Sequence, residues 1–255
     1  MLCHKLFSQP DYSLGDVQAV HKVPTPRYGG LAVFLATLTA VFIFQIESIK
    51  WIILASSPIF LVGLAEDFHF KTTPTSRYII GAFSAVCRIF LSGVVLNSVD
   101  LGYFNKLLSM SFIAFIFTVF CIVGLINAVN LIDGIHGLSS GVAVIMSISL
   151  FIVATRADDL ELANLGIILA AASLGLMVLN YPFGKLFLGD SGAYFIGFSI
   201  AWVMILLAMR YGEISKWSLL AIVFWPIMET VFSIFRRKLS GRSSDKPDRM
   251  HFHHI

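Results

Sequence analysis

Long stretches without Asp, Glu, Lys or Arg constrain the fold of this chain most strongly. Each is close to the roughly 20 residues that a helix needs to cross about 30 Å of hydrocarbon. Five of them predict a span directly: Tyr28 to Ile46, Leu107 to Ile132, Gly134 to Thr155, Leu162 to Gly184 and Ser191 to Met209. Three weaker candidates are Trp51 to Ala65, Tyr78 to Val99 with Arg88 inside it, and Trp217 to Phe235 with Glu229 inside it. The sequence therefore predicts an all-α integral membrane protein with about eight transmembrane helices.

The composition agrees with a membrane protein, because 57% of the residues are hydrophobic and only 13% are charged, against roughly 25% charged in soluble domains. The three cysteines lack metal-ligand spacing, and two lie inside predicted spans, so we interpret them as small apolar residues. No repeat or linker divides the chain, which predicts a single membrane domain over residues 1–255. Residues 1–28 hold no apolar core, so we expect no cleaved signal peptide.

The basic residues predict how the chain is oriented in the membrane. With eight spans, both termini share one side, which holds twelve of the 18 Lys and Arg residues; five lie on the other side, and Arg88 lies within a span. The positive-inside bias then places residues 1–28 and 236–255 in the cytoplasm. The net charge of +3 is a poor argument for a nucleic-acid partner, because the basic residues must first be assigned to the two sides of the membrane.

The unusual polar residues all fall in loops predicted on the cytoplasmic side. These loops contain HKVPTPRYGG (21–30), GLAEDF (63–68), NAVNLIDGIHG (127–137), FLGDSG (187–192) and DRMHFHH (248–254). Four carboxylates, Glu66, Asp67, Asp133 and Asp190, lie at predicted helix ends, where an acid is costly unless it is paired or binds a cation. Their location on one side predicts a metal, a cationic partner, or both. Helix capping is the alternative explanation for any single one of them.

Two of these motifs carry residues that suit a hard cation or a phosphate. Asn127, Asn130 and Asp133 are spaced i, i+3, i+6, which puts them on one broad stripe of a helix. Asp190 lies between Gly189 and Ser191 just before an uncharged span, so it can present an oxygen ligand at a helix start.

The histidine-rich end of the chain allows several interpretations. His251, His253 and His254 could ligate a transition metal or bind a phosphate. The remaining histidines do not cluster in the sequence, which favours phosphate binding. A solvated tail that happens to be rich in histidine is the other alternative.

Taken together, the motifs resemble those of the polyprenyl-phosphate N-acetylhexosamine-1-phosphate transferases, the group that includes WecA-type and MraY-type enzymes. The resemblance runs from His21 to His254. It implies that Glu66 and Asp67 handle the lipid phosphate, with Asp133 as a further catalytic residue. It also implies that Asp190 binds magnesium with Asn130 as a second contact. The substrate-binding residues that it implies are Lys22, Thr25, Lys71, Arg77, Asn127, His136, His251, His253 and His254.

The resemblance further implies the reaction and its setting. An N-acetylhexosamine-1-phosphate passes from a UDP-sugar to polyprenyl phosphate, UMP leaves, and Mg²⁺, or Mn²⁺ as an alternative, is the cofactor. The expected location is the bacterial inner membrane, in the synthesis of cell-envelope polysaccharide such as O-antigen, and a homodimer is one option for the assembly. A transporter and an inactive scaffold are the alternative functions. In transporters the coupling residues lie near the membrane midplane, which disfavours the first.

The sequence departs from the family pattern in three respects. Glu66 stands where many members have Asp, and His136 stands where many have a second acid. Members usually have ten or more spans, so the resemblance implies one further span before His21 and at least one after Ile255.

Overall fold

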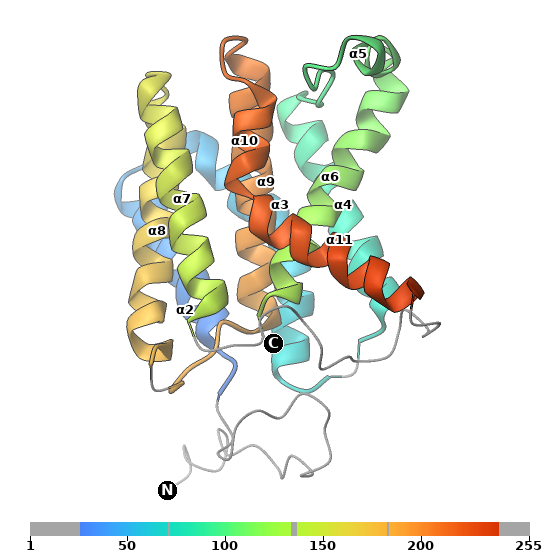
Figure 1. Ribbon diagram of the computed structural model, residues 1–255. Helices are drawn as coiled ribbons and strands as arrows, with labels where there is room; N and C mark the ends of the chain where they lie inside the picture. Colours follow the sequence, from blue (N-terminus) through green and yellow to red (C-terminus); the bar gives the residue numbers. More distant parts are fainter. Residues whose placement is uncertain (1–25, 71, 134–136, 183, 240–255) are drawn as a thin grey trace, which may run out of the picture.

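The computed structural model describes residues 26–70, 72–133, 137–182 and 184–239, and within these residues all regular structure is helical. The helices are α2 Gly29–Ile43, α3 Glu47–Asp67, α4 Pro74–Ser92, α5 Gly102–Leu108, α6 Ser111–Leu131, α7 Leu138–Arg156, α8 Leu160–Asn180, α9 Gly189–Arg210, α10 Lys216–Ile222 and α11 Phe224–Leu239. The prediction of an all-α protein is confirmed. Figure 1 shows most of these helices running side by side as a bundle.

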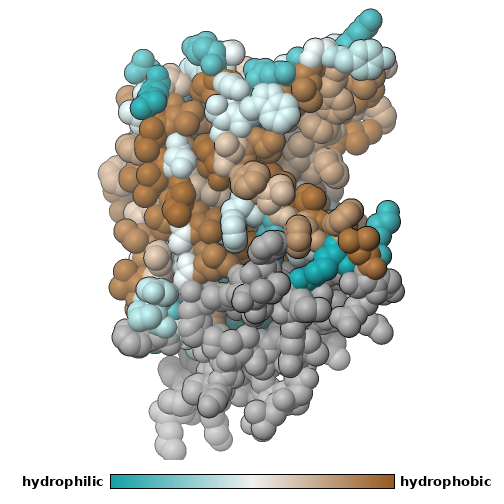
Figure 2. All heavy atoms as spheres, in the orientation of Figure 1, coloured by the Kyte–Doolittle hydropathy of each residue, from teal (hydrophilic) through white to brown (hydrophobic). Residues whose placement is uncertain are grey.

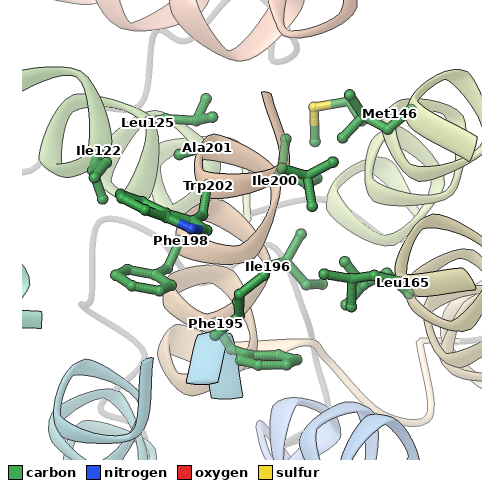
Figure 3. Packing of buried hydrophobic residues seen from close by; sticks show 14 of the residues in the cluster. Ile122, Leu125, Met146, Leu165, Phe195, Ile196, Phe198, Ile200, Ala201 and Trp202 are labelled. Atoms are coloured by element: carbon green, nitrogen blue, oxygen red, sulfur yellow. The ribbon is translucent and has the colours of Figure 1, made fainter. Parts of the chain in front are cut away.

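Helix α9 forms the core of the bundle. Nearly all of its residues are buried, and α2, α3, α6 and α7 pack against it. In Figure 3, Ile122 and Leu125 of α6 lie on one side of α9, and Met146 of α7 and Leu165 of α8 lie on another. A helix that is apolar on every face is stable when other helices surround it. Helix α9 is therefore the central helix against which the others pack.

Close packing holds α2 and α3 against α9. The rings of Phe34 and Phe60 stack at 4.0 Å between centroids, and Phe195 of α9 meets Phe34 edge-on at 5.0 Å. Nearer the start of α9 the backbones themselves meet, because a Cβ on Gly30 would lie 2.1 Å from the amide nitrogen of Gly192. Small residues allow such close helix approach in membrane proteins.

In the part of the chain that the structure describes, five helices are long and apolar enough to cross a membrane: α3 from Ile49, α6, α7, α8 and α9. Helix α2 is apolar but has only 15 residues. Helices α10 and α11 pass the same test as a pair. The multi-pass character of the chain is therefore supported by five or six spans, and the number of eight stays a prediction.

The predicted span from Trp217 to Phe235 is a bent pair of helices in the structure. The segment is divided into α10 and α11, which are bent by 74°, and Figure 1 shows α11 crossing the bundle obliquely. Pro226 lies in the first turn of α11, where the missing amide of a proline is tolerated, whereas within a continuous helix it would remove a hydrogen bond. The bend therefore has a local cause in the sequence.

The surface of the bundle is largely apolar along its length, as Figure 2 shows. Phe42, Phe90 and Phe120 are each at least 70% exposed. In water such a surface would favour aggregation, whereas in a bilayer it faces hydrocarbon. The exposed aromatic side chains thus agree with a membrane-embedded bundle.

The two ends of the bundle differ in their polar contacts. At the end away from the start of α9, called the far end here, Asp159 caps α8 and accepts hydrogen bonds from Arg210 at 2.9 Å and Tyr211 at 3.1 Å. Lys216 forms an ion pair with Asp100 at 3.0 Å. These acids are paired with basic side chains. The opposite end, called the site end, holds the start of α9 and the ends of α3 and α6 (Figure 1).

Candidate active site at the start of helix α9

The first turn of α9 is capped by two carboxylates from elsewhere in the chain, one at the end of α3 and one just beyond α6. Its own N-cap residue, Leu188, offers no capping side chain. Instead the amide of Gly189 donates to Asp133 Oδ2 at 3.0 Å, and the amides of Asp190 and Ser191 donate to the two oxygens of Asp67 at 2.8 and 3.0 Å. Helix amides at an N-terminus lack internal partners and favour negative charge. Two distant acids therefore fix where α9 begins.

Asp190 is presented in the middle of this arrangement. It is partly buried, and its Oδ1 accepts a hydrogen bond from the Asn130 amide at 2.5 Å. Asn130 is on the last turn of α6, so the predicted proximity of Asn130 and Asp190 agrees with the geometry. Asn127, one turn earlier, donates to the carbonyl of Val123 in its own helix at 2.7 Å.

Glu66 is held by three donors. Arg77 Nε lies 2.8 Å from Glu66 Oε1, Tyr194 Oη donates to Oε2 at 3.2 Å, and the Thr72 hydroxyl donates to Oε1. About a third of the Arg77 side chain is exposed, against 5% for Glu66. Guanidinium groups suit phosphate recognition, and the exposed part of Arg77 leaves it donors for such a ligand.

Asp133 lies just beyond α6 and joins α7 to α9. It accepts a hydrogen bond from the Ser139 hydroxyl at 2.6 Å in addition to the one from Gly189. Burial raises the pKa of the Asp133 carboxyl above its ordinary value, and the positive charge of Arg27 acts in the opposite direction. The carboxyl is therefore harder to ionise than an exposed aspartate.

Backbone contacts bring two further motifs to the same place. Residues 26–30 run beside residues 187–188, with hydrogen bonds from Phe187 to Pro26, from Gly29 to Phe187 and from Gly30 to Leu188 at 2.9, 2.9 and 2.6 Å. Four of the five polar motifs therefore meet at the start of α9. The fifth motif lies outside the described residues, as do Lys22, Thr25, Lys71, His136, His251, His253 and His254.

Comparison with known proteins identifies the family. The sequence profile described as glycosyl transferase family 4 matches residues 49–208. The chain belongs to glycosyl transferase family 4.

Individual known proteins are similar to most of this chain. An undecaprenyl-phosphate alpha-N-acetylglucosaminyl 1-phosphate transferase of Pasteurella multocida is 34% identical and that of Haemophilus influenzae 31%, each over 92% of this chain and 68% of its own length. A decaprenyl-phosphate N-acetylglucosaminephosphotransferase of Mycobacterium leprae is 30% identical over 92% of this chain and 67% of its own length. The chain spans about two thirds of the length of the relatives that it matches.

Several residues of this family 4 site could not be predicted from the polar loops alone. Tyr194 lies inside an apolar span, yet its hydroxyl reaches Glu66; its position one turn after Asp190 is the signal that could have found it. Asn180, at the end of α8, accepts a hydrogen bond from the Gly137 amide and donates to the Leu186 carbonyl at 2.7 Å. It therefore connects the start of α7 to the segment that leads into α9.

The oxygen donors of the family 4 site fit a magnesium ion better than a transition metal. Within the described residues no three His, Cys, Asp or Glu side chains form a group that alone could hold a metal. Mg²⁺ is commonly held by one or two carboxylates together with substrate phosphates and water. Asp190 provides such a carboxylate, and Asn130, whose NH₂ group donates to it, also carries an amide oxygen.

Proposed function

We propose that this protein transfers N-acetylglucosamine-1-phosphate from UDP-N-acetylglucosamine to a polyprenyl phosphate in the membrane, releasing UMP. The convergence of four polar motifs on the start of α9, with Asp190 at its centre, is the observation that carries the proposal. Membership of glycosyl transferase family 4 supports it, as do the names of the relatives, which describe undecaprenyl- and decaprenyl-phosphate N-acetylglucosamine-1-phosphate transferases.

In the proposed reaction an oxygen of the lipid phosphate attacks the β-phosphorus of the UDP-sugar. One phosphorus–oxygen bond forms, the anhydride bond to the α-phosphate breaks, and its electron pair leaves on UMP. One phosphoanhydride replaces another, so we expect the reaction to be reversible. Because two anions must meet, the protein has to supply positive charge and hydrogen-bond donors.

The residues that would receive the two phosphates come from different elements. We assign the lipid phosphate to the side of Glu66 and Arg77, where the exposed part of the guanidinium can donate to phosphate oxygens. We assign the nucleotide-sugar to the side of Asn127, Asn130 and Asp133. The family resemblance adds Lys22, Thr25, Lys71, His136, His251, His253 and His254 to these two groups of phosphate-binding residues.

Asp190 and Asn130 would hold the magnesium ion. When bound, this ion would neutralise negative charge on the phosphates and stabilise the charge that develops on the leaving group. The apolar flanks of the bundle would place the site end at the membrane surface, where a lipid phosphate and a soluble nucleotide can both reach it. We place this end on the cytoplasmic side, with both termini, from the distribution of basic residues.

A product assay on the full chain tests the proposal. Membranes that contain the protein are incubated with radiolabelled UDP-N-acetylglucosamine, polyprenyl phosphate and Mg²⁺, and both UMP and labelled lipid are measured. We expect both to appear together and to require Mg²⁺. Uptake of intact nucleotide-sugar without UMP would indicate a transporter, and the absence of any product would indicate a scaffold; either result would overturn the proposed function.

A further inference from the structure

Asp67 has an environment unlike that of the neighbouring acid, Glu66. Only 2% of Asp67 is exposed, and both carboxylate oxygens are occupied. Oδ1 accepts from the amide of Asp190 at 2.8 Å, while Oδ2 accepts from the amide of Ser191 at 3.0 Å and from the Ser191 hydroxyl. All three donors belong to the first turn of α9.

The backbone conformation at Gly189 allows the contact between Asp67 and the first turn of α9. Gly189 has φ +75°, and a Cβ there would lie 2.6 Å from Asp67 Oδ1 and 2.2 Å from the carbonyl oxygen of Arg27. A larger residue would push α9 away from Asp67, and only glycine adopts this backbone conformation readily. A glycine at this position therefore allows the end of α3 to approach the start of α9 closely.

These contacts leave Asp67 poorly suited to receive a proton from a substrate. A general base must lie within hydrogen-bond reach of the group that it deprotonates, and the oxygens of Asp67 point at the amides of α9. Glu66, in contrast, is bound within the described residues only by side chains, among them the partly exposed Arg77. The two consecutive acids thus have different tasks.

We infer that Asp67 is a positioning residue that fixes the first turn of α9 and, through it, the carboxylate of Asp190 against Asn130. The inference rests on the proposed function in one respect, namely that Asp190 binds the magnesium ion. Side chains that orient a metal ligand typically change metal affinity or activity by about 10- to 100-fold when they are replaced. Asp67 acts on the metal through Asp190 and not on the lipid phosphate.

The substitution Asp67→Asn tests this role. An asparagine keeps one acceptor oxygen and places an NH₂ group against the donors of Ser191, so the first turn of α9 should loosen. We expect the apparent activation constant for Mg²⁺ to rise by about 10- to 100-fold, with most of the turnover recovered at saturating Mg²⁺. Ser191→Ala removes one of the three donors and should shift the same constant in the same direction by a smaller factor.

Hydrogen exchange gives a readout that needs no turnover. In protein without Mg²⁺, peptides covering residues 188–195 should exchange faster in Asp67→Asn than in the wild type. Glu66→Gln is the matched control. Within the described residues Glu66 contacts the side chains of Thr72, Arg77 and Tyr194 and no backbone amide of α9, so this variant should leave the exchange unchanged. If the proposed function fails, the wild type forms no labelled lipid, yet the exchange comparison still stands.

Two results would overturn the inference. One is an Asp67→Asn protein that is inactive at every Mg²⁺ concentration but exchanges like the wild type over residues 188–195, since that pattern belongs to a lost catalytic base. The other applies if Asp67→Asn does not fold: a Ser191→Ala protein with unchanged exchange and an unchanged Mg²⁺ constant would show that these contacts do not position Asp190.

Discussion

Four carboxylates gather at the site end, and their partners separate their roles at the scale of single residues. Glu66 is bound by side chains, Asp67 by amides of α9, and Asp133 by one hydroxyl and one amide. Asp190 accepts only the Asn130 amide within the described part of the chain. It is therefore the acid with most oxygen capacity left for a cation, since an ionised carboxylate has about four acceptor positions.

Replacing Asp190 by Asn should abolish most of the transferase activity of the protein. A catalytic metal ion supplies several kcal/mol of transition-state stabilisation, and about 1.4 kcal/mol corresponds to a tenfold change in rate. We expect product formation to fall by about 100-fold or more in the labelled-lipid assay. Asp158→Asn, an exposed acid at the far end, is the control and should retain wild-type rates. Near-normal turnover in Asp190→Asn would contradict its assignment as the metal ligand.

The residues that the sequence identified are those whose polarity conflicts with their place in a hydrophobic chain. Asp67, Asn130 and Asp190 stand at the ends of apolar stretches, so a functional reason for them could be expected without a structure. Asn180 and Tyr194 could not be recognised in this way, because their importance depends on partners 43 and 128 positions away. Helical periodicity predicts which residues share a face but does not predict which helix lies opposite.

At the scale of helices, α9 organises the site because the elements that carry the polar motifs converge on it. Helix α3 approaches it closely, at a point where a Cβ on Gly63 would lie 2.6 Å from Ser191 Cα. The uncharged stretches predicted α9 well, since its interior position requires an apolar sequence on every face. They did not predict the break before α11, because hydropathy averaged over a window hides a single proline such as Pro226.

A methyl group at Gly63 should separate α3 from α9 and weaken both folding and function. Backbone atoms of α9 cannot yield as a flexible side chain can, so we expect Gly63→Ala to cost about 1–3 kcal/mol, the usual range for overpacking. Thermal unfolding in detergent or nanodiscs measures this cost. Gly124→Ala on α6 is the matched control, since nothing lies within 4 Å of the added Cβ. Equal melting temperatures for the two variants would contradict the tight α3–α9 contact.

For the whole molecule, the two ends of the bundle carry charge for different purposes. At the far end, Arg210 is paired with Asp159 and Lys216 with Asp100, so these basic residues mainly join helices. At the site end the carboxylates are arranged around the start of α9, and Arg77 is partly exposed to solvent. The polarity of the sequence predicted this asymmetry, although the partners at each end became clear only from the packing of the helices.

The positive-inside bias predicts that the site end faces the cytoplasm. Single cysteines placed at exposed positions, in a protein whose own three cysteines are replaced, can test this with a membrane-impermeant maleimide. His69→Cys at the site end should react in inside-out vesicles and stay unlabelled in spheroplasts, whereas Glu213→Cys at the far end should show the reverse pattern; both positions are exposed. Labelling of both positions from one side would refute the orientation. The proposed reaction requires a lipid phosphate and a nucleotide-sugar to meet at one membrane face. Labelling of His69→Cys only in spheroplasts would place the site on the outer face, where cytoplasmic nucleotide-sugar cannot reach it.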